Sequence, residues 1–155
     1  MEKRKFDELL DCVQQAYYSV AREMLEFSVE ASDETADLGE ERVSIVIGMT
    51  GKNKGRILFE MNRGLAEVIA EAVNYEPLSD PMELYLCTAE FTNIFCGNAV
   101  TLINNKFRGT EMRLTPPAVF AGKGMEISTP NITSSRFYIT SEHGAAYMDV
   151  GFEGV

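Results

Sequence analysis

Hydrophobic and polar positions follow two different periods along the chain, and each period predicts a kind of element. From Phe6 to Phe27 the large apolar side chains recur every three or four residues, which is typical of an amphipathic helix. From Val43 to Met49 they recur at every second residue, as in a strand with one buried face. The same alternation returns from Ile57 to Met61 after a short glycine-bounded turn, so these two strands predict a hairpin.

Two further helices are predicted from their start signals. Asn62 is a helix-capping residue type, and it precedes the amphipathic segment Arg63 to Val73. Asp80-Pro81 is a stronger signal, because an aspartate cap followed by proline favours the first turn of a helix. The helix that this pair opens is predicted to continue to about Asn105, with Gly97 as its one weak position.

The rest of the chain divides into an acidic segment and a series of strands. Residues 28–41 carry six acidic side chains among few apolar ones, which predicts a solvated acidic loop. The strands predicted after Thr110 are Glu111–Thr115, Met125–Ser128, Arg136–Ser141 and Ala145–Phe152. This order of elements predicts an α+β fold, with helices packed against a mainly antiparallel sheet, in a single domain over residues 1–155.

Charge and composition narrow the possible functions. The formal net charge is −10 and the pI is about 4.6, which argues against nucleic acid as a partner, because phosphates require a basic surface. No run of 18 or more apolar residues and no signal-peptide core occur, so we expect a cytoplasmic protein without a membrane span. Three cysteines without a C-x-x-C pair and one histidine disfavour both a disulfide and a zinc site.

The helix predicted from Pro81 carries a polar stripe on one side. Glu90 and Asn93 lie three positions apart, so their side chains project from neighbouring positions. The stripe consists of Leu86, Glu90, Asn93, Gly97, Val100 and Asn104. The predicted core-facing side, on which Asn98 is expected to be a buried and hydrogen-bonded amide, consists of Leu84, Cys87, Phe91, Ile94, Phe95, Asn98 and Leu102.

Two explanations of the polar stripe remain open from the residues alone. The spacing by itself favours an ordinary solvent-exposed strip, since polar pairs at this spacing are common on helices. Gly97 favours a functional surface, because an interior glycine costs about 1 kcal/mol of helix stability relative to alanine. Such a residue often permits the close approach of another backbone.

The stripe and a distant proline resemble the motif of the CheC/CheX/FliY family, whose members dephosphorylate the chemotaxis response regulator CheY. That motif is Asp or Ser, three residues, Glu, two residues, Asn, twenty-two residues, Pro. Glu90 and Asn93 match its core, and Pro116 follows Asn93 after 22 residues. Leu86 occupies the Asp/Ser position, which is a departure from the motif. Having one Glu-x-x-Asn helix, the chain resembles CheX rather than CheC, which has two.

The resemblance implies a substrate, a partner and a role for each residue. The substrate is the aspartyl phosphate of a CheY-like receiver domain. Asn93 would orient the attacking water, and Glu90 would pair with the active-site lysine of the receiver. Leu86, Gly97 and Pro116 would support the contact with this partner. The chain would need no cofactor of its own, because the receiver's own carboxylates would hold Mg²⁺.

A second hypothesis and an oligomeric state complete these expectations. Leu86 in the stripe favours burial against a partner, so the chain is alternatively a non-catalytic binding module for a receiver domain or a flagellar-switch protein. We further expect a homodimer that pairs through sheet edges, because exposed edges readily accept another strand. The terminal hairpin, Arg136 to Phe152, is the expected source of such an edge.

Overall fold

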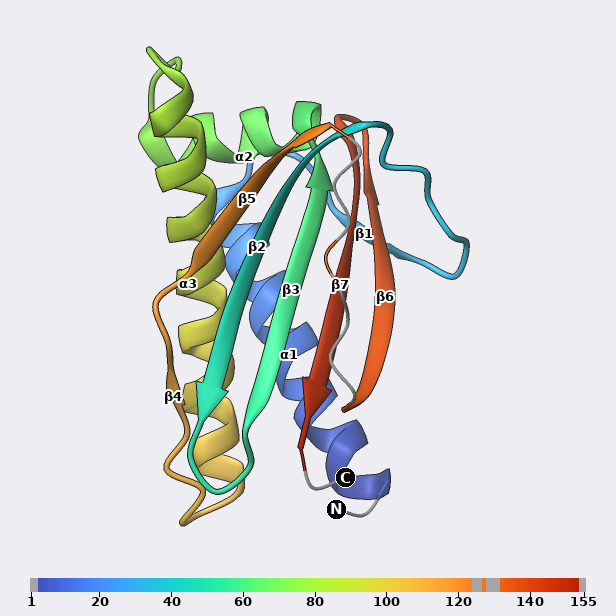
Figure 1. Ribbon diagram of the computed structural model, residues 1–155, viewed down its shortest axis with the longest axis vertical. Coiled ribbons are helices and arrows are strands. Elements are labelled where there is room, and N and C mark those ends of the chain that lie inside the picture. Colours follow the sequence, from blue (N-terminus) through green and yellow to red (C-terminus); the bar gives the residue numbers. More distant parts are fainter. Residues whose placement is uncertain (1–2, 124–126, 128–131, 154–155) are drawn as a thin grey trace.

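The computed structural model describes residues 3–123, 127 and 132–153 of the chain. The helices formed by these residues are α1 (Lys3–Met24), α2 (Arg63–Asn74) and α3 (Pro81–Lys106). The strands are β1 (Glu30–Ser32), β2 (Glu41–Thr50), β3 (Gly55–Asn62), β4 (Arg113–Leu114), β5 (Ala118–Lys123), β6 (Thr133–Ser141) and β7 (Gly144–Phe152). The helices lie on one face of the sheet that the strands form (Figure 1).

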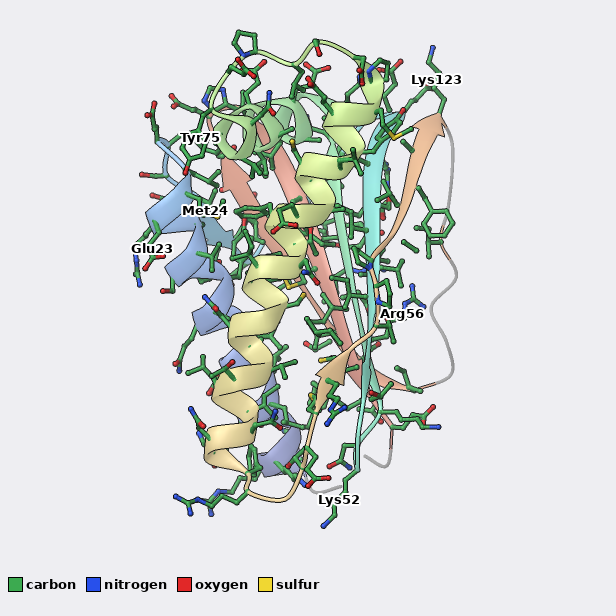
Figure 2. The ribbon with its side chains drawn as sticks, turned by 90° about the vertical axis from the view of Figure 1, so that its left-hand side faces the viewer. Glu23, Met24, Lys52, Arg56, Tyr75 and Lys123 are labelled. Carbon is green, nitrogen blue, oxygen red and sulfur yellow. The ribbon has the colours of Figure 1, made fainter. Side chains whose placement is uncertain are left out.

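The strands are arranged in the order β1-β6-β7-β3-β2, and both β4 and β5 pair with the outer edge of β2. Each of these pairs is antiparallel. The predicted α+β fold with a mainly antiparallel sheet is therefore confirmed. Figure 2 shows α3 crossing in front of the sheet with α1 on one side of it and β4 and β5 on the other, and α3 contacts all three elements.

The predicted hairpin is β2–β3, and its register explains the alternating pattern of the sequence. Ile45 pairs with Phe59, and Ile47 pairs with Ile57. All four side chains are completely buried. Because alternate residues of a strand point to opposite faces, the same register places the apolar positions of both strands on one face, beneath the helices.

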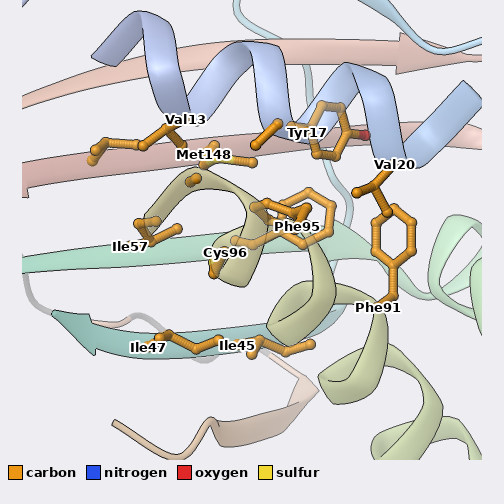
Figure 3. Close-up of a cluster of buried hydrophobic side chains, with 14 of the residues drawn as sticks. Val13, Tyr17, Val20, Ile45, Ile47, Ile57, Phe91, Phe95, Cys96 and Met148 are labelled. Atoms are coloured by element: carbon orange, nitrogen blue, oxygen red, sulfur yellow. The ribbon is translucent and has the colours of Figure 1, made fainter. Parts of the chain in front are cut away.

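An aromatic cluster joins α1, α3 and the sheet in the centre of the core (Figure 3). The rings of Tyr17 and Phe95 lie 5.2 Å apart between centroids, at an interplanar angle of 89°. Phe59 of β3 lies 5.5 Å from Phe95, also edge to face. Phe91 packs against the same rings. These contacts, which are the preferred geometry for aromatic pairs, hold α3 at a defined orientation on the sheet.

Some predicted boundaries are wrong. The first helix ends at Met24 rather than Phe27, and the strand expected at Glu111–Thr115 is reduced to the two residues of β4. The strand β5 was not expected, because its outward-facing Phe120 masks the inward alternation of Val119 and Ala121. The strand predicted at Met125–Ser128 lies outside the described residues except for Ile127.

The acidic segment is not entirely a solvated loop. β1 forms within it, because the backbone of Glu30–Ser32 pairs with β6 even though its side chains are largely exposed. Leu38 is buried against Leu58 and Tyr147 on the face of the sheet opposite the helices. Glu60 on this face is also buried, where it accepts a hydrogen bond from the Tyr147 hydroxyl. The segment therefore covers a second, smaller apolar cluster.

The helix α3 is long and apolar enough, by length and composition alone, to cross a membrane. Its most apolar 18-residue window is 44% buried, and α3 packs against α1, α2 and β2. The core helix of a soluble protein has these same properties. The absence of a membrane span therefore remains a prediction.

Candidate functional site

The beginning of α3 is held by reciprocal hydrogen bonds. Asp80 caps the helix, and its side chain accepts a hydrogen bond from the backbone N–H of Glu83 at 3.0 Å. The Glu83 carboxylate in turn accepts from the backbone N–H of Ser79 at 2.6 Å. Such reciprocal capping satisfies N–H groups that a helix end leaves unpaired. The predicted Asp80-Pro81 start is confirmed, and the helix presents its side chains from a rigid base.

The buried side of α3 differs from the predicted one, and Asn98 is the clearest error. Thr88 and Thr92 are completely buried, whereas Asn98 and Leu102 are exposed. The hydroxyls of Thr88 and Thr92 donate to the carbonyls of Leu84 and Thr88, each at 2.8 Å. Because these bonds satisfy the hydroxyls inside the helix, the threonines can enter the core, and the buried side is rotated away from Asn98.

The first residues of the polar stripe face away from the core, as predicted, whereas Val100 near its end packs against the core. Glu90 is exposed, Asn93 is half-buried, and Leu86 is 62% exposed. Within the part of the chain that the structure describes, neither the Glu90 carboxylate nor the Asn93 carboxamide forms a hydrogen bond or an ion pair. A Cβ placed on Gly97 would meet no atom within 4 Å. The part of the stripe from Leu86 to Gly97 is therefore an open helix surface, and its two polar side chains have no partner in the described chain.

Pro116 lies in the connection between β4 and β5, both of which contact α3. The preceding residue, Thr115, anchors this connection to β2. Its N–H donates to the Gly48 carbonyl and its hydroxyl accepts from the Gly48 N–H, both at 2.9 Å. Glycine permits this approach, because a Cβ at position 48 would lie 3.1 Å from the Thr115 side chain. The structure thus places exposed Pro116 on a fixed segment at the side of α3.

A second anchor comes from Asn104, the last residue of the polar stripe. Its amide nitrogen donates to the Met112 carbonyl at 3.0 Å, and its amide oxygen accepts from the Met112 N–H at 2.8 Å. This pair of bonds fastens the chain just before β4 to the end of α3. The sequence indicated Asn104 only as a stripe residue, because no local pattern announces a partner eight residues further on.

The cysteine nearest the stripe is unsuited to nucleophilic chemistry. Burial raises the pKa of the half-buried Cys87 thiol, and the carboxylates of Glu83 and Glu90 raise it further. Burial raises the pKa of Cys96 far above its ordinary value. A protonated thiol is a poor nucleophile, so neither cysteine is a candidate nucleophile at this surface. Among the described residues, no three His, Cys, Asp or Glu side chains converge as a metal-binding group.

The fold and the stripe together define an α+β protein that presents a Glu-x-x-Asn helix at the edge of an antiparallel sheet. Residues 43–141 match the family model described as chemotaxis phosphatase CheX. The chain belongs to this family, as its motif suggested. No curated protein matches the sequence significantly.

Solved structures of related proteins share the fold over nearly their whole length. The chemotaxis protein CheX from Vibrio vulnificus has a TM-score of 0.81 and 22% identity, covering 94% of this chain and 99% of that one. A CheC-like chemotactic protein from Shewanella oneidensis has a TM-score of 0.76 and 28% identity, covering 94% of this chain and 97% of that one. A CheX–CheY–BeF₃–Mg²⁺ complex from Borrelia burgdorferi has a TM-score of 0.71 and 24% identity, covering 93% of this chain and 97% of that one.

Proposed function

We propose that this protein dephosphorylates the aspartyl phosphate of a CheY-like response regulator, with Asn93 orienting water and Glu90 docking the receiver. The observation that carries the proposal is the pair of unused polar groups on the open side of α3, in a chain that belongs to the chemotaxis phosphatase CheX family. The solved CheX–CheY complex supports a CheY-like partner.

The chemistry requires little of the protein. An aspartyl phosphate is a mixed anhydride, and water attacks its phosphorus while the bond to the aspartyl oxygen breaks, which releases inorganic phosphate and the free carboxylate. Catalysis then consists of positioning the water in line and balancing charge. The Asn93 carboxamide can donate one hydrogen bond and accept another, which suits it to hold that water.

Glu90 has a different role from Asn93 because its carboxylate can only accept hydrogen bonds. It is exposed and one helical turn from Asn93, so a lysine ammonium of the receiver can reach it without displacing a partner within this chain. The receiver's carboxylates would hold Mg²⁺, and the protein itself would contribute no cofactor.

Three residues near Glu90 and Asn93 would support the contact with the receiver, namely Leu86, Gly97 and Pro116. Leu86 replaces the acidic or hydroxyl residue of the motif with an exposed apolar side chain, and it would be buried against the receiver. Gly97 leaves open space on the helix surface that the backbone of a partner can enter. Pro116 would border the contact from the segment that Thr115 anchors.

The alternative function, a non-catalytic receiver-binding or flagellar-switch-binding module, rests on Leu86. One experiment separates the two: a phosphorylated receiver is mixed with wild-type protein, Asn93→Ala or Glu90→Ala, and binding and phosphate release are both measured. We expect Asn93→Ala to bind and release no phosphate above the spontaneous rate, and Glu90→Ala to lose binding. Binding without any accelerated release by the wild type would instead establish the module.

We also propose a homodimer, but only one strand of the terminal hairpin can supply the sheet edge through which it pairs. β7 pairs on both sides, with β3 and β6, so it supplies no open edge. In the described residues, β1 covers β6 only at Tyr138–Thr140, which leaves residues 134–137 without a strand partner on that side. Light scattering at micromolar concentration should give twice the 17.3 kDa chain mass, and a monomeric mass would contradict the dimer.

A further inference from the structure

Tyr75 is poorly explained by folding. It follows α2 with φ 61°, in the left-handed region, and its N–H donates to the Glu71 carbonyl at 2.9 Å. Helices commonly end with glycine at such a position, because glycine has no Cβ to strain the backbone. The Tyr75 side chain is also 92% exposed. Glycine would avoid both the strain and the exposed ring, so Tyr75 is a candidate for a role in binding.

Tyr75 is one of the residues that line a pocket of about 580 Å³. The end of α1, the helix α2 and the turn between β6 and β7 form its walls. The apolar lining residues are Met24, Phe27, Val68, Ala72 and Pro77. Figure 2 shows Tyr75 projecting beside Met24, above the end of α1. The pocket has no wall from α3, so it is separate from the Glu90 stripe.

The remaining lining residues make the pocket strongly acidic. They are Glu26, Glu71, Glu76, Glu142 and His143. His143 is the one basic group among them, and its Nε2 already lies 3.4 Å from the Glu142 carboxylate while its ring packs on Phe27. Within the described chain, the carboxylates of Glu26, Glu71 and Glu76 form no ion pair. Three carboxylates without ion-pair partners, in the same lining as five apolar residues, are complementary to a cation with an apolar neighbour.

We propose that this surface, the Tyr75 pocket, binds a basic segment of a protein partner. An arginine or lysine of that segment stacks on the face of the Tyr75 ring and meets the Glu71 and Glu76 carboxylates. An adjacent apolar residue of the segment enters the floor at Met24 and Phe27. This binding is independent of the phosphatase activity proposed for α3.

The test is a titration of the isotope-labelled full chain, followed by NMR, with the capped peptide acetyl-Arg-Leu-Arg-Leu-amide. We expect saturable shifts at the lining residues that weaken as salt is added. The same peptide with citrulline in place of arginine should not bind. Tyr75→Gly should weaken binding about tenfold. Phe120→Ala removes another exposed ring, on β5, and should leave binding unchanged.

Two further measurements separate peptide binding at Tyr75 from folding and from the activity proposed for α3. Tyr75→Gly should unfold at no lower temperature than the wild type and should dephosphorylate a receiver at the wild-type rate, so the two proposals can fail separately. Shifts spread over the whole acidic surface, equal binding of the citrulline peptide, or undiminished binding to Tyr75→Gly would each overturn the Tyr75 pocket as a site.

Discussion

Replacing Asn104 with alanine should detach the Pro116 segment from α3. The change removes two hydrogen bonds to the Met112 backbone, at 3.0 and 2.8 Å. Each is worth about 1 kcal/mol, so we expect the free energy of unfolding to fall by about 2 kcal/mol. Urea denaturation monitored by circular dichroism measures this difference. Asn105→Ala is the matched control, because the Asn105 side chain is exposed and forms no hydrogen bond with the described residues. This variant should change stability by less than about 0.5 kcal/mol.

The same variant should alter catalysis in a specific way. If the segment borders the docked receiver, loosening it weakens docking more than it disturbs the water on Asn93. Asn104→Ala should therefore raise KM for the phosphorylated receiver while kcat stays within about twofold. A stability loss no larger than that of Asn105→Ala would show that the Asn104 hydrogen bonds do not fasten the segment. A fall of kcat without a change of KM would refute a role of the segment in docking.

Other variants test separate parts of the structure. The buried Tyr17 hydroxyl has no hydrogen-bond partner within the described residues, so Tyr17→Phe should raise the free energy of unfolding by about 1 kcal/mol in urea denaturation. Gly48→Val should lower the melting temperature, because overpacking against Thr115 costs about 1 to 3 kcal/mol, whereas an unchanged melting point would contradict the close approach. Burial raises the Cys87 pKa, so its thiol stays protonated at neutral pH, and Cys87→Ser should retain the full dephosphorylation rate.

The elements with local signals could be predicted from the sequence. Asn62 and Asp80 cap their helices as their residue types indicate, and the alternation in β2 and β3 places the correct side chains in the core. The exposure of Glu90 also followed from helical spacing, because one charge in an otherwise apolar helix faces solvent unless it is paired.

Features that depend on distant partners could not be predicted. Helical spacing placed Asn98 inside and left Thr92 out, because the pattern does not show that a threonine hydroxyl can bond within its own helix. The hydrogen bonds of Asn104 to Met112 and of Thr115 to Gly48 join residues that come together only in the folded chain. The left-handed cap at Tyr75 was likewise not predicted, because the residue in that position is a tyrosine and the neighbouring asparagine, Asn74, is the last residue of the helix.

The role proposed for Asn93 is to position water for dephosphorylation of a receiver. The most direct measurement is the decay of a radiolabelled phospho-receiver from the same genome, alone and with wild type, Asn93→Ala or Asn98→Ala. Asn98 is an exposed asparagine on the same helix but outside the stripe, so its variant controls for general effects. We predict faster decay with wild type and Asn98→Ala and only the spontaneous rate with Asn93→Ala. Equal acceleration by all three proteins, or by none, would contradict this role of Asn93.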